Sequence, residues 1–595
     1  TAITTGYNNT AVGYNAGAAV TTGSSNTAIG FKSLDANTTA SNNTAIGKSA
    51  LGSNTDGDSN TAVGFSTLAS NTTGTNNVGV GRESLGNNTT ASNNTALGYA
   101  ALLTNTTGTR NTAVGALAGD ANTEGNYNSA FGYNSLGANT TGTHNTALGD
   151  FSQAANTTGI KNVSIGQGAF ITSTTGSNNV VVGTEAMTAN TTASNNTAVG
   201  FQSLYANTTG TSNTAVGKSA LAANITGSNH TALGKDALLV STAGGYDTAL
   251  GDSVLKANTT GNYNTGVGAS ALAANTTASY NTAVGYASLA ANTTGTRMTS
   301  VGSHSGMQNT TGNYNAFFGY DAGESNTTGA SNTFVGDSAG RETTTASNNT
   351  AVGQSALLAN TTASDNTSVG AGSMDATTTG AFNSALGSEA LGANTTGASN
   401  VAVGVSALAA NTTASNNTAV GRDALIANTT GGQNTGLGIY ALQTTTTGAY
   451  NIGIGYNATS SSATVTGQCT LGEGSITNLR CNDQSISALS DSRDKTDVID
   501  SPYGLDFINT VRPVQFKWES RDGNGKDGST RIGFLAQELL AATDGNNAVL
   551  DLVMDDNPDK LEAKYGNLLP IAIQAIQELS TQLDAALARI TTLEG

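Results

Sequence analysis

The stretch Asn26-Thr27-Ala28-Ile29-Gly30 returns, with small changes, every 17 residues along most of the chain. Its closing glycine recurs 28 times from Gly13 to Gly472, and no residue is inserted or lost in the series. A fixed period of this size is typical of a solenoid, in which each repeat forms one coil of a stack. A disordered chain has no reason to keep such a count, although Asn, Thr, Gly and Ala dominate the composition.

The four residues before each glycine predict a short β-strand. Numbered from the glycine as position 0, they are Asn at 13, Thr at 14, Ala at 15 and Val, Ile or Leu at 16. Side chains alternate along a strand, so Asn and Ala share one face while Thr and Val share the other. A lone solenoid with one wet face should be polar on that face. We therefore expect one face to line the coil and the other to meet a neighbouring chain.

Two further positions complete the predicted coil. A leucine at position 4, as in Leu34 and Leu51, supplies a second row of core side chains. The glycine at position 0 never varies, which predicts either a positive φ or a backbone that passes too close for a Cβ. If each repeat is one coil, 27 steps of roughly 4.8 Å make a rod of about 130 Å. Three intertwined chains in a triple β-helix fit the same spacing.

Composition excludes several classes of function. The chain has 595 residues and a formal charge of −17, which argues against nucleic acid as a partner. It has no apolar run long enough to span a bilayer. It begins at Thr1 without an initiator Met or a secretory segment, so we expect a fragment or a trimmed chain. The array offers no recurring pair of carboxylates, which disfavours a glycan-degrading enzyme.

The cysteines and histidines do not form a metal site by spacing. Cys469 and Cys481 match no metal-ligand pattern, and their spacing leaves open whether they form a disulfide. His144, His230 and His304 fall at repeat positions 12, 13 and 2, which places them on different faces of the coil. We expect them to be surface or corner substitutions. No metal and no cofactor is predicted.

The composition changes near residue 480: all four prolines and the one tryptophan, Trp518, follow that point. We divide the chain into an array of 28 repeats at 1–472, a junction at 473–488 and a small α+β domain at 489–595. In this domain we expect a helix ending before Pro513, strands at 514–518 and 550–554, and a final helix at 567–594. Its heptad a and d positions predict a coiled coil; they are Leu569, Ile576, Leu579, Leu583, Ala586, Ile590 and Leu593. A single helix packed on its own domain is the alternative.

The Asn-Thr-Ala-Val-Gly repeats resemble the head repeats of trimeric autotransporter adhesins. That resemblance implies a trimeric parallel β-roll, although the period here is longer than in that family. Two other interpretations of the array stay open: a bacterial surface adhesin with an upstream membrane anchor, and an ice- or glycan-binding protein with exposed threonine rows.

The C-terminal domain resembles the intramolecular chaperone of phage endosialidases and other phage tail fibres. The resemblance rests on five stretches, which are Ser490-Asp-x-Arg-x-Lys495, Val514–Trp518 after Pro513, Gly533-Phe-Leu-Ala-Gln-Glu538, Tyr565-x-x-Leu568 and Ala575-Ile-Gln-Glu-Leu579. It implies a trimeric folding module that cuts the chain at its own N-terminal boundary. Ser490 would then be the nucleophile, Lys495 the general base and Leu489–Ser490 the cleaved bond.

The chemistry of such a cut is plausible on the residues alone. A serine can attack the carbonyl carbon of the preceding residue and form an ester, which water then hydrolyses. A lysine acts as a base only when neutral, so burial or a nearby positive charge, such as Arg493, must lower its pKa. A solvated linker is the competing interpretation of these charged residues.

These observations predict a homotrimeric β-solenoid fibre with a self-cleaving C-terminal chaperone. A phage tail fibre or a similar extracellular appendage fits best, and the shaft could also contact a host glycan or protein receptor. Identical coils can pair out of register at little cost, which explains why three such chains need to be aligned from one end.

Overall fold

The computed structural model describes residues 5–473, 476, 490–519, 528–559 and 561–595. It divides into two compact units, residues 1–362 and 363–595, and each is described by itself.

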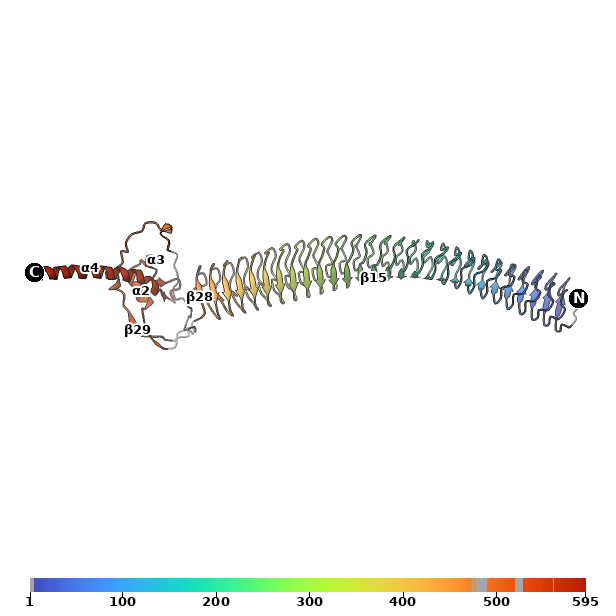
Figure 1. The fold of residues 1–595 in the computed structure, drawn as a ribbon, viewed down its shortest axis with the longest axis horizontal. Coiled ribbons are helices and arrows are strands. Elements are labelled where there is room, and N and C mark those ends of the chain that lie inside the picture. The colour runs from blue at the N-terminus through green and yellow to red at the C-terminus, as the bar shows by residue number, and fades with distance from the viewer. Residues whose placement is uncertain (1–4, 474–475, 477–489, 520–527, 560) are drawn as a thin grey trace. The chain divides into compact units, whose positions relative to one another are not determined.

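Three-residue strands recur every 17 residues in both units, as the repeat predicts. The first unit holds β1 (Thr10–Val12), β2 (Thr27–Ile29), β3 (Thr44–Ile46), β4 (Thr61–Val63) and so on at the same spacing, through β15 (Thr248–Leu250), to β21 (Thr350–Val352). The second unit holds β22 (Thr367–Val369) and its successors to β28 (Cys469–Leu471). Figure 1 shows one strand in each coil, with the coils stacked around it. The predicted parallel β-solenoid is confirmed.

Strand pairing joins equivalent positions of neighbouring coils. Ala28 in β2 lies opposite Ala45 in β3, and Ala45 lies opposite Ala62 in β4, in parallel register. Backbone bonds beside the strands follow the same rule, because the Thr27 N–H donates to the carbonyl of Asn43 at 2.8 Å. Each coil is therefore completed by one chain, and the triple β-helix of intertwined chains is not the arrangement found.

Alanine, leucine and asparagine side chains fill the interior of the coil. Ala45 and Leu51 are fully buried, as are their equivalents in the neighbouring coils. The asparagines at positions 7 and 13 form two ladders along the stack. At position 7 the Asn54 side-chain amide donates to Asn37 Oδ1 at 3.0 Å, and at position 13 the Asn60 backbone N–H donates to Asn43 Oδ1 at 2.9 Å. Buried polar groups thus find partners one coil away, which ties register to hydrogen bonding.

The invariant glycine is required on both predicted grounds. Gly30 has a φ of +135°, a conformation that L side chains rarely adopt. A Cβ added there would lie 2.5 Å from the carbonyl oxygen of Gly47 in the next coil. Any side chain at this position would strain its own backbone and push adjacent coils apart.

Two coils exchange large and small core residues in a compensating way. Phe317 and Phe334 replace the usual alanine at position 15 and stack with ring centroids 5.3 Å apart. Glycines replace the usual leucine at position 4 beside them, and a Cβ on Gly323 or Gly340 would lie within 2.8 Å of a ring. The added aromatic volume thus occupies the space that the leucines leave, as close packing demands.

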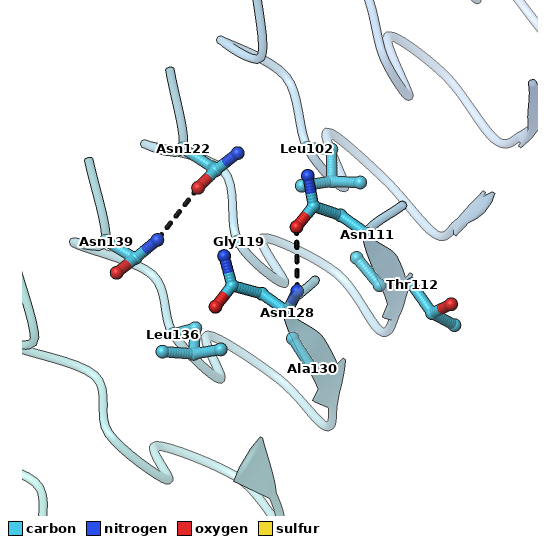
Figure 2. A pocket seen from close by; sticks show the side chains of 10 residues that line it. Leu102, Asn111, Thr112, Gly119, Asn122, Asn128, Ala130, Leu136 and Asn139 are labelled. Carbon is cyan, nitrogen blue, oxygen red and sulfur yellow. Dashed lines mark hydrogen bonds between the residues drawn. The ribbon is translucent and has the colours of Figure 1, made fainter. Parts of the chain in front are cut away.

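Gly119 also replaces the leucine at position 4, but no aromatic side chain fills the space beside it. It stands in the leucine row between Leu102 and Leu136, and the residue facing it, Ala130, is the ordinary alanine. A small cavity lies at this point of the core, as Figure 2 shows. The flanking asparagine ladders are intact, since the Asn139 amide donates to Asn122 Oδ1 at 2.8 Å. The coil therefore keeps its shape around an underfilled core.

The prediction for the histidines is wrong for His230. This residue replaces an asparagine of the position 13 ladder and is fully buried, with its Nδ1 3.6 Å from the buried carboxylate of Asp247. Burial lowers the pKa of His230 to about 4 and raises that of Asp247 to about 7. Asp247 also accepts from the Asn264 backbone N–H at 2.8 Å. His144, by contrast, is exposed and stacks on Tyr127.

The second unit continues beyond the repeats as a small α+β region. Its elements are η1 (Ser492–Asp494), α1 (Leu505–Ile508), β29 (Val514–Lys517), β30 (Thr530–Gly533), α2 (Ala536–Ala542), α3 (Asn547–Leu550), β31 (Val553–Met554), β32 (Glu562–Ala563), η2 (Tyr565–Asn567) and α4 (Leu568–Glu594). β29 pairs with β30 and β31 with β32, both antiparallel. Phe507, Leu539, Leu552 and Ile571 lie in one buried cluster that joins α1, α2 and α4.

The predicted final helix is confirmed as α4, and the strand predicted at 550–554 is partly wrong. Leu550 ends α3, and only Val553 and Met554 are in strand conformation. Asn547 explains the difference, because its side chain accepts from the Val553 N–H at 3.2 Å and donates to the Val553 carbonyl at 2.9 Å. Those bonds fold the segment back on itself instead of letting it extend.

Candidate functional site

The N-terminal edge of the α+β region brings together the two residues predicted to cut the chain. Lys495 Nζ lies 2.5 Å from Ser490 Oγ and donates a hydrogen bond to it. The short 3₁₀ turn η1 separates the two residues and returns the chain, so that a spacing of five residues becomes a direct contact. The predicted scissile bond includes Leu489, which lies outside the described residues.

Asp491 holds this turn in shape. Its carboxylate caps η1 by accepting from the Arg493 backbone N–H at 2.9 Å, and it also accepts from the Arg493 Nε at 3.0 Å. The Arg493 guanidinium holds the pKa of Asp491 below its usual range. Because Arg493 is engaged in this pair, its charge is largely balanced before it can act on Lys495. Arg493 is therefore less free to act on Lys495 than the sequence alone suggests.

Every residue from Ser490 to Asp500 is exposed in the single chain. A lysine that donates to a serine oxygen is arranged to take the proton of that serine, provided that the amine first becomes neutral. The single chain therefore has the contact that a Ser–Lys pair needs without the burial that would activate it.

The remaining resemblance stretches lie in the structural framework behind this edge. Arg512 and Glu538 form an ion pair, which lowers the pKa of Glu538 and raises that of Arg512. The Phe534 backbone N–H donates to the Tyr565 hydroxyl at 3.2 Å. Gly533 lies against that hydroxyl, and a Cβ there would come within 2.6 Å of it. Within the described residues, these contacts connect β30, α2 and η2 to one another, and none of them involves Ser490 or Lys495.

Glu578 lies in one of the resemblance stretches, and its structural role was not predicted. Its Oε2 accepts from the Leu505 backbone N–H at 2.7 Å, at the start of α1. Glu578 is far away in the sequence on α4, and Gly504 gives its carboxylate room. A capping carboxylate supplied by a distant helix leaves no local signal, since capping motifs are recognised within a few residues.

The outer half of α4 has an uncovered apolar stripe. Leu568, Ile571 and Ala575 pack into the domain core. The a and d residues from Ile576 to Leu593 point away from it, and Ile576, Leu579, Leu583, Ile590 and Leu593 are each at least half exposed. The single-helix alternative does not account for them, because they pack on nothing within the described part of this chain.

Comparison with known protein families identifies the region that begins at Ser490. Residues 490–550 match the Peptidase S74 family, described as chaperone of endosialidase. The chain therefore carries an endosialidase-type chaperone domain after a long β-solenoid. No curated protein matches the chain. The chaperone match starts at the residue predicted to attack the chain, directly after the predicted junction.

The described part of the chain also bears on membrane insertion and metal binding. No helix there is long and apolar enough to cross a membrane. No group of three or more His, Cys, Asp or Glu side chains there is placed to hold a metal ion. Cys469 lies exposed on β28, whereas Cys481 falls outside the described residues.

Proposed function

We propose that the chain is a homotrimeric fibre shaft whose chaperone domain aligns three copies and then cuts itself away. The match to an endosialidase-type chaperone, starting at Ser490 behind a 17-residue solenoid, carries this proposal. A phage tail fibre or a similar extracellular appendage is the setting that fits best.

The cut follows from the Ser490–Lys495 pair in two steps. Neutral Lys495 takes the proton of the Ser490 hydroxyl as Oγ attacks the Leu489 carbonyl carbon. The peptide C–N bond breaks, the Leu489 acyl group becomes an ester on Oγ, and the freed Ser490 amine receives a proton. Water then hydrolyses the ester and leaves the Leu489 carboxylate and the Ser490 hydroxyl. The reaction needs no metal and no cofactor.

Assembly supplies the activation that the single chain lacks. The edge that holds Ser490 and Lys495 is fully exposed in one copy. Packing of three copies would bury this edge, and burial disfavours a charged amine. Cutting would then occur only in assembled trimers.

Register explains why a shaft of this kind needs a chaperone. Neighbouring coils present almost the same surface, so chains that associate one coil out of step lose little energy. A trimeric clamp at one end sets the alignment, and coils then stack outward from it. Removal of the clamp closes the route back to separate chains and makes the shaft kinetically stable.

Intact-mass measurement of the purified full chain tests the cut. The wild type should yield the fragment 490–595, whereas Ser490→Ala and Lys495→Ala should remain whole. Lys517→Ala, an exposed lysine on β29 of the same domain, is the control and should be cut normally. A wild type that stays whole as a trimer would remove the enzymatic step and leave the fibre architecture in place.

A further inference from the structure

The outer face of the β-strands carries one apolar row along the whole first unit. The last residue of each strand, at position 16, is Val, Ile, Leu or Phe in every coil. Its side chain points away from the alanine core and is half-buried or exposed; Leu97 and Leu148, for example, are each 46% exposed. Large apolar side chains at such exposure, repeated without a break, are unusual on a free surface.

The neighbouring rows of the same face are also free of charge. Position 14 is mostly threonine and is half-buried, as at Thr197 and Thr282, or exposed, as at Thr214. Every Lys, Arg, Asp and Glu of residues 1–362 falls outside positions 14, 15, 16 and 0. The charged side chains instead follow the glycine or lie at the other corners, as with Arg82 and Glu83. The strand face is thus the uncharged side of an otherwise charged coil.

We propose that this strand face, with its position 16 row at the centre, is the surface on which copies of this chain pack against one another in parallel. The inference rests on the proposed fibre function and names the surface that holds the shaft together. The occupant is a second and third copy of the same solenoid.

The period of the row favours another copy over any other partner. A globular protein would cover a few coils and leave the rest exposed, whereas the row continues through all 21 strands of the first unit. An identical solenoid has the same spacing, so parallel copies in register place each apolar side chain beside its equivalent. The absence of charge at these positions removes the like-charge repulsion that equivalent residues of identical chains would otherwise meet.

The available area is sufficient for a stable interface. If each coil covers on the order of 60 Å² of this row, 21 coils cover roughly 1,200 Å² per chain, more than the roughly 800 Å² per partner of a standard interface. The contribution of each coil is small, so strength comes from repetition. A copy shifted by one coil loses contacts only at its ends, so this surface alone specifies register weakly and the alignment has to be set by another part of the chain.

Cysteine cross-linking in the full chain tests the surface. In a background with Cys469→Ser and Cys481→Ser, Val199→Cys places a thiol in the outer row of β12 (Thr197–Val199). Thr192→Cys places one at an exposed corner of the same coil, as the matched control. On mild oxidation the Val199→Cys chain should form covalent dimers in high yield, and the Thr192→Cys chain should stay at least tenfold less cross-linked.

The outcomes separate this inference from the proposed function. Native mass measurement that finds only monomers would overturn the fibre proposal and the interface together. A trimer in which Val199→Cys is not cross-linked, or is cross-linked no better than Thr192→Cys, would overturn the interface alone. A monomer whose strand face binds ice, seen as thermal hysteresis lost in Val182→Lys, would assign this face to ice instead. If Val199→Cys fails to fold, Val216→Cys on the next coil repeats the test.

Discussion

Filling the cavity beside Gly119 should stabilise the solenoid, whereas the same substitution at Gly340 should break it. Both glycines occupy the leucine position of the repeat and have nearly the same φ, +59° and +58°. Leucines at this position in other coils have the same backbone conformation, for example Leu102 with φ +50°. Leucine therefore fits the backbone at both sites, and only the surrounding core differs.

The surrounding core makes the change in stability favourable at Gly119 and unfavourable at Gly340. At Gly119 a Cβ would meet the flexible end of Leu102 at 3.1 Å, next to the cavity in Figure 2. Burying a leucine side chain there stabilises the fold by about 1.5–3 kcal/mol, and placing a side chain on a left-handed backbone costs about 1–2 kcal/mol of that stability. At Gly340 a Cβ would lie 2.5 Å from the ring of Phe334. Overpacking of this kind costs about 3 kcal/mol or more.

Local hydrogen exchange followed by mass spectrometry measures both effects in the intact shaft. Amides of the coil around Gly119→Leu should exchange roughly fivefold more slowly for a gain of about 1 kcal/mol, since 1.4 kcal/mol is a factor of ten. Amides around Gly340→Leu should exchange more than a hundredfold faster. Coils far from either site should keep wild-type rates. Equal effects of the two substitutions would refute the reasoning, because they would mean that backbone strain and not core space decides the outcome.

Three further predictions concern charge, backbone and assembly. In the wild type, Asp247 and His230 together hold one proton from about pH 4 to 6.5 in both the folded and the unfolded state, so the local stability should not change with pH in this range. The variant Asp247→Asn leaves a buried histidine whose pKa of about 4 lies below its usual value. Its local stability, measured by hydrogen exchange corrected for intrinsic rates, should fall by roughly 2–3 kcal/mol as the pH drops from 6.5 toward 4. A pH-independent variant would contradict this. Gly200→Ala, at a φ of +131°, should lower the free energy of opening its coil to protease by about 2–4 kcal/mol. Gly210→Ala should cost clearly less, because Gly210 has no positive φ and other coils have alanine at this position, although its Cβ would come 2.2 Å from the Gly227 carbonyl oxygen and the backbone must shift to admit it. Leu583→Ser should lower the concentration of denaturant at which the released 490–595 trimer dissociates, and an unchanged midpoint would argue against a coiled coil of α4.

The period alone was enough to predict the coil and the two faces of its strand, Asn with Ala and Thr with Val, but not which of the two faces points inward. Each depends on a residue repeated at one phase, and repetition averages out local exceptions. The exceptions were not predictable in the same way. His230 resembles a surface substitution until its partner Asp247, one coil later, is seen to share the same buried ladder. The Phe334–Gly340 exchange likewise needs knowledge of which positions face each other across the coil.

The resemblance named the residues of the candidate site, whose catalytic roles stay predictions, and it did not indicate their surroundings. Resemblance pointed to Ser490 and Lys495, and the structure places their side chains in contact. Exposure of the pair and the engagement of Arg493 by Asp491 depend on geometry that no motif records. Glu578 was missed because the group it caps belongs to a different helix.

The ring of Phe334 fills the space that Gly340 leaves, and this pairing limits how such a shaft can gain or lose coils during evolution. Recombination between similar repeats adds or deletes whole coils, and most breakpoints leave every core contact with an equivalent neighbour. A breakpoint that separates Phe334 from Gly340 would instead bring the ring against a leucine. Natural length variants should therefore inherit these two residues together, as a fixed block within an otherwise extensible series.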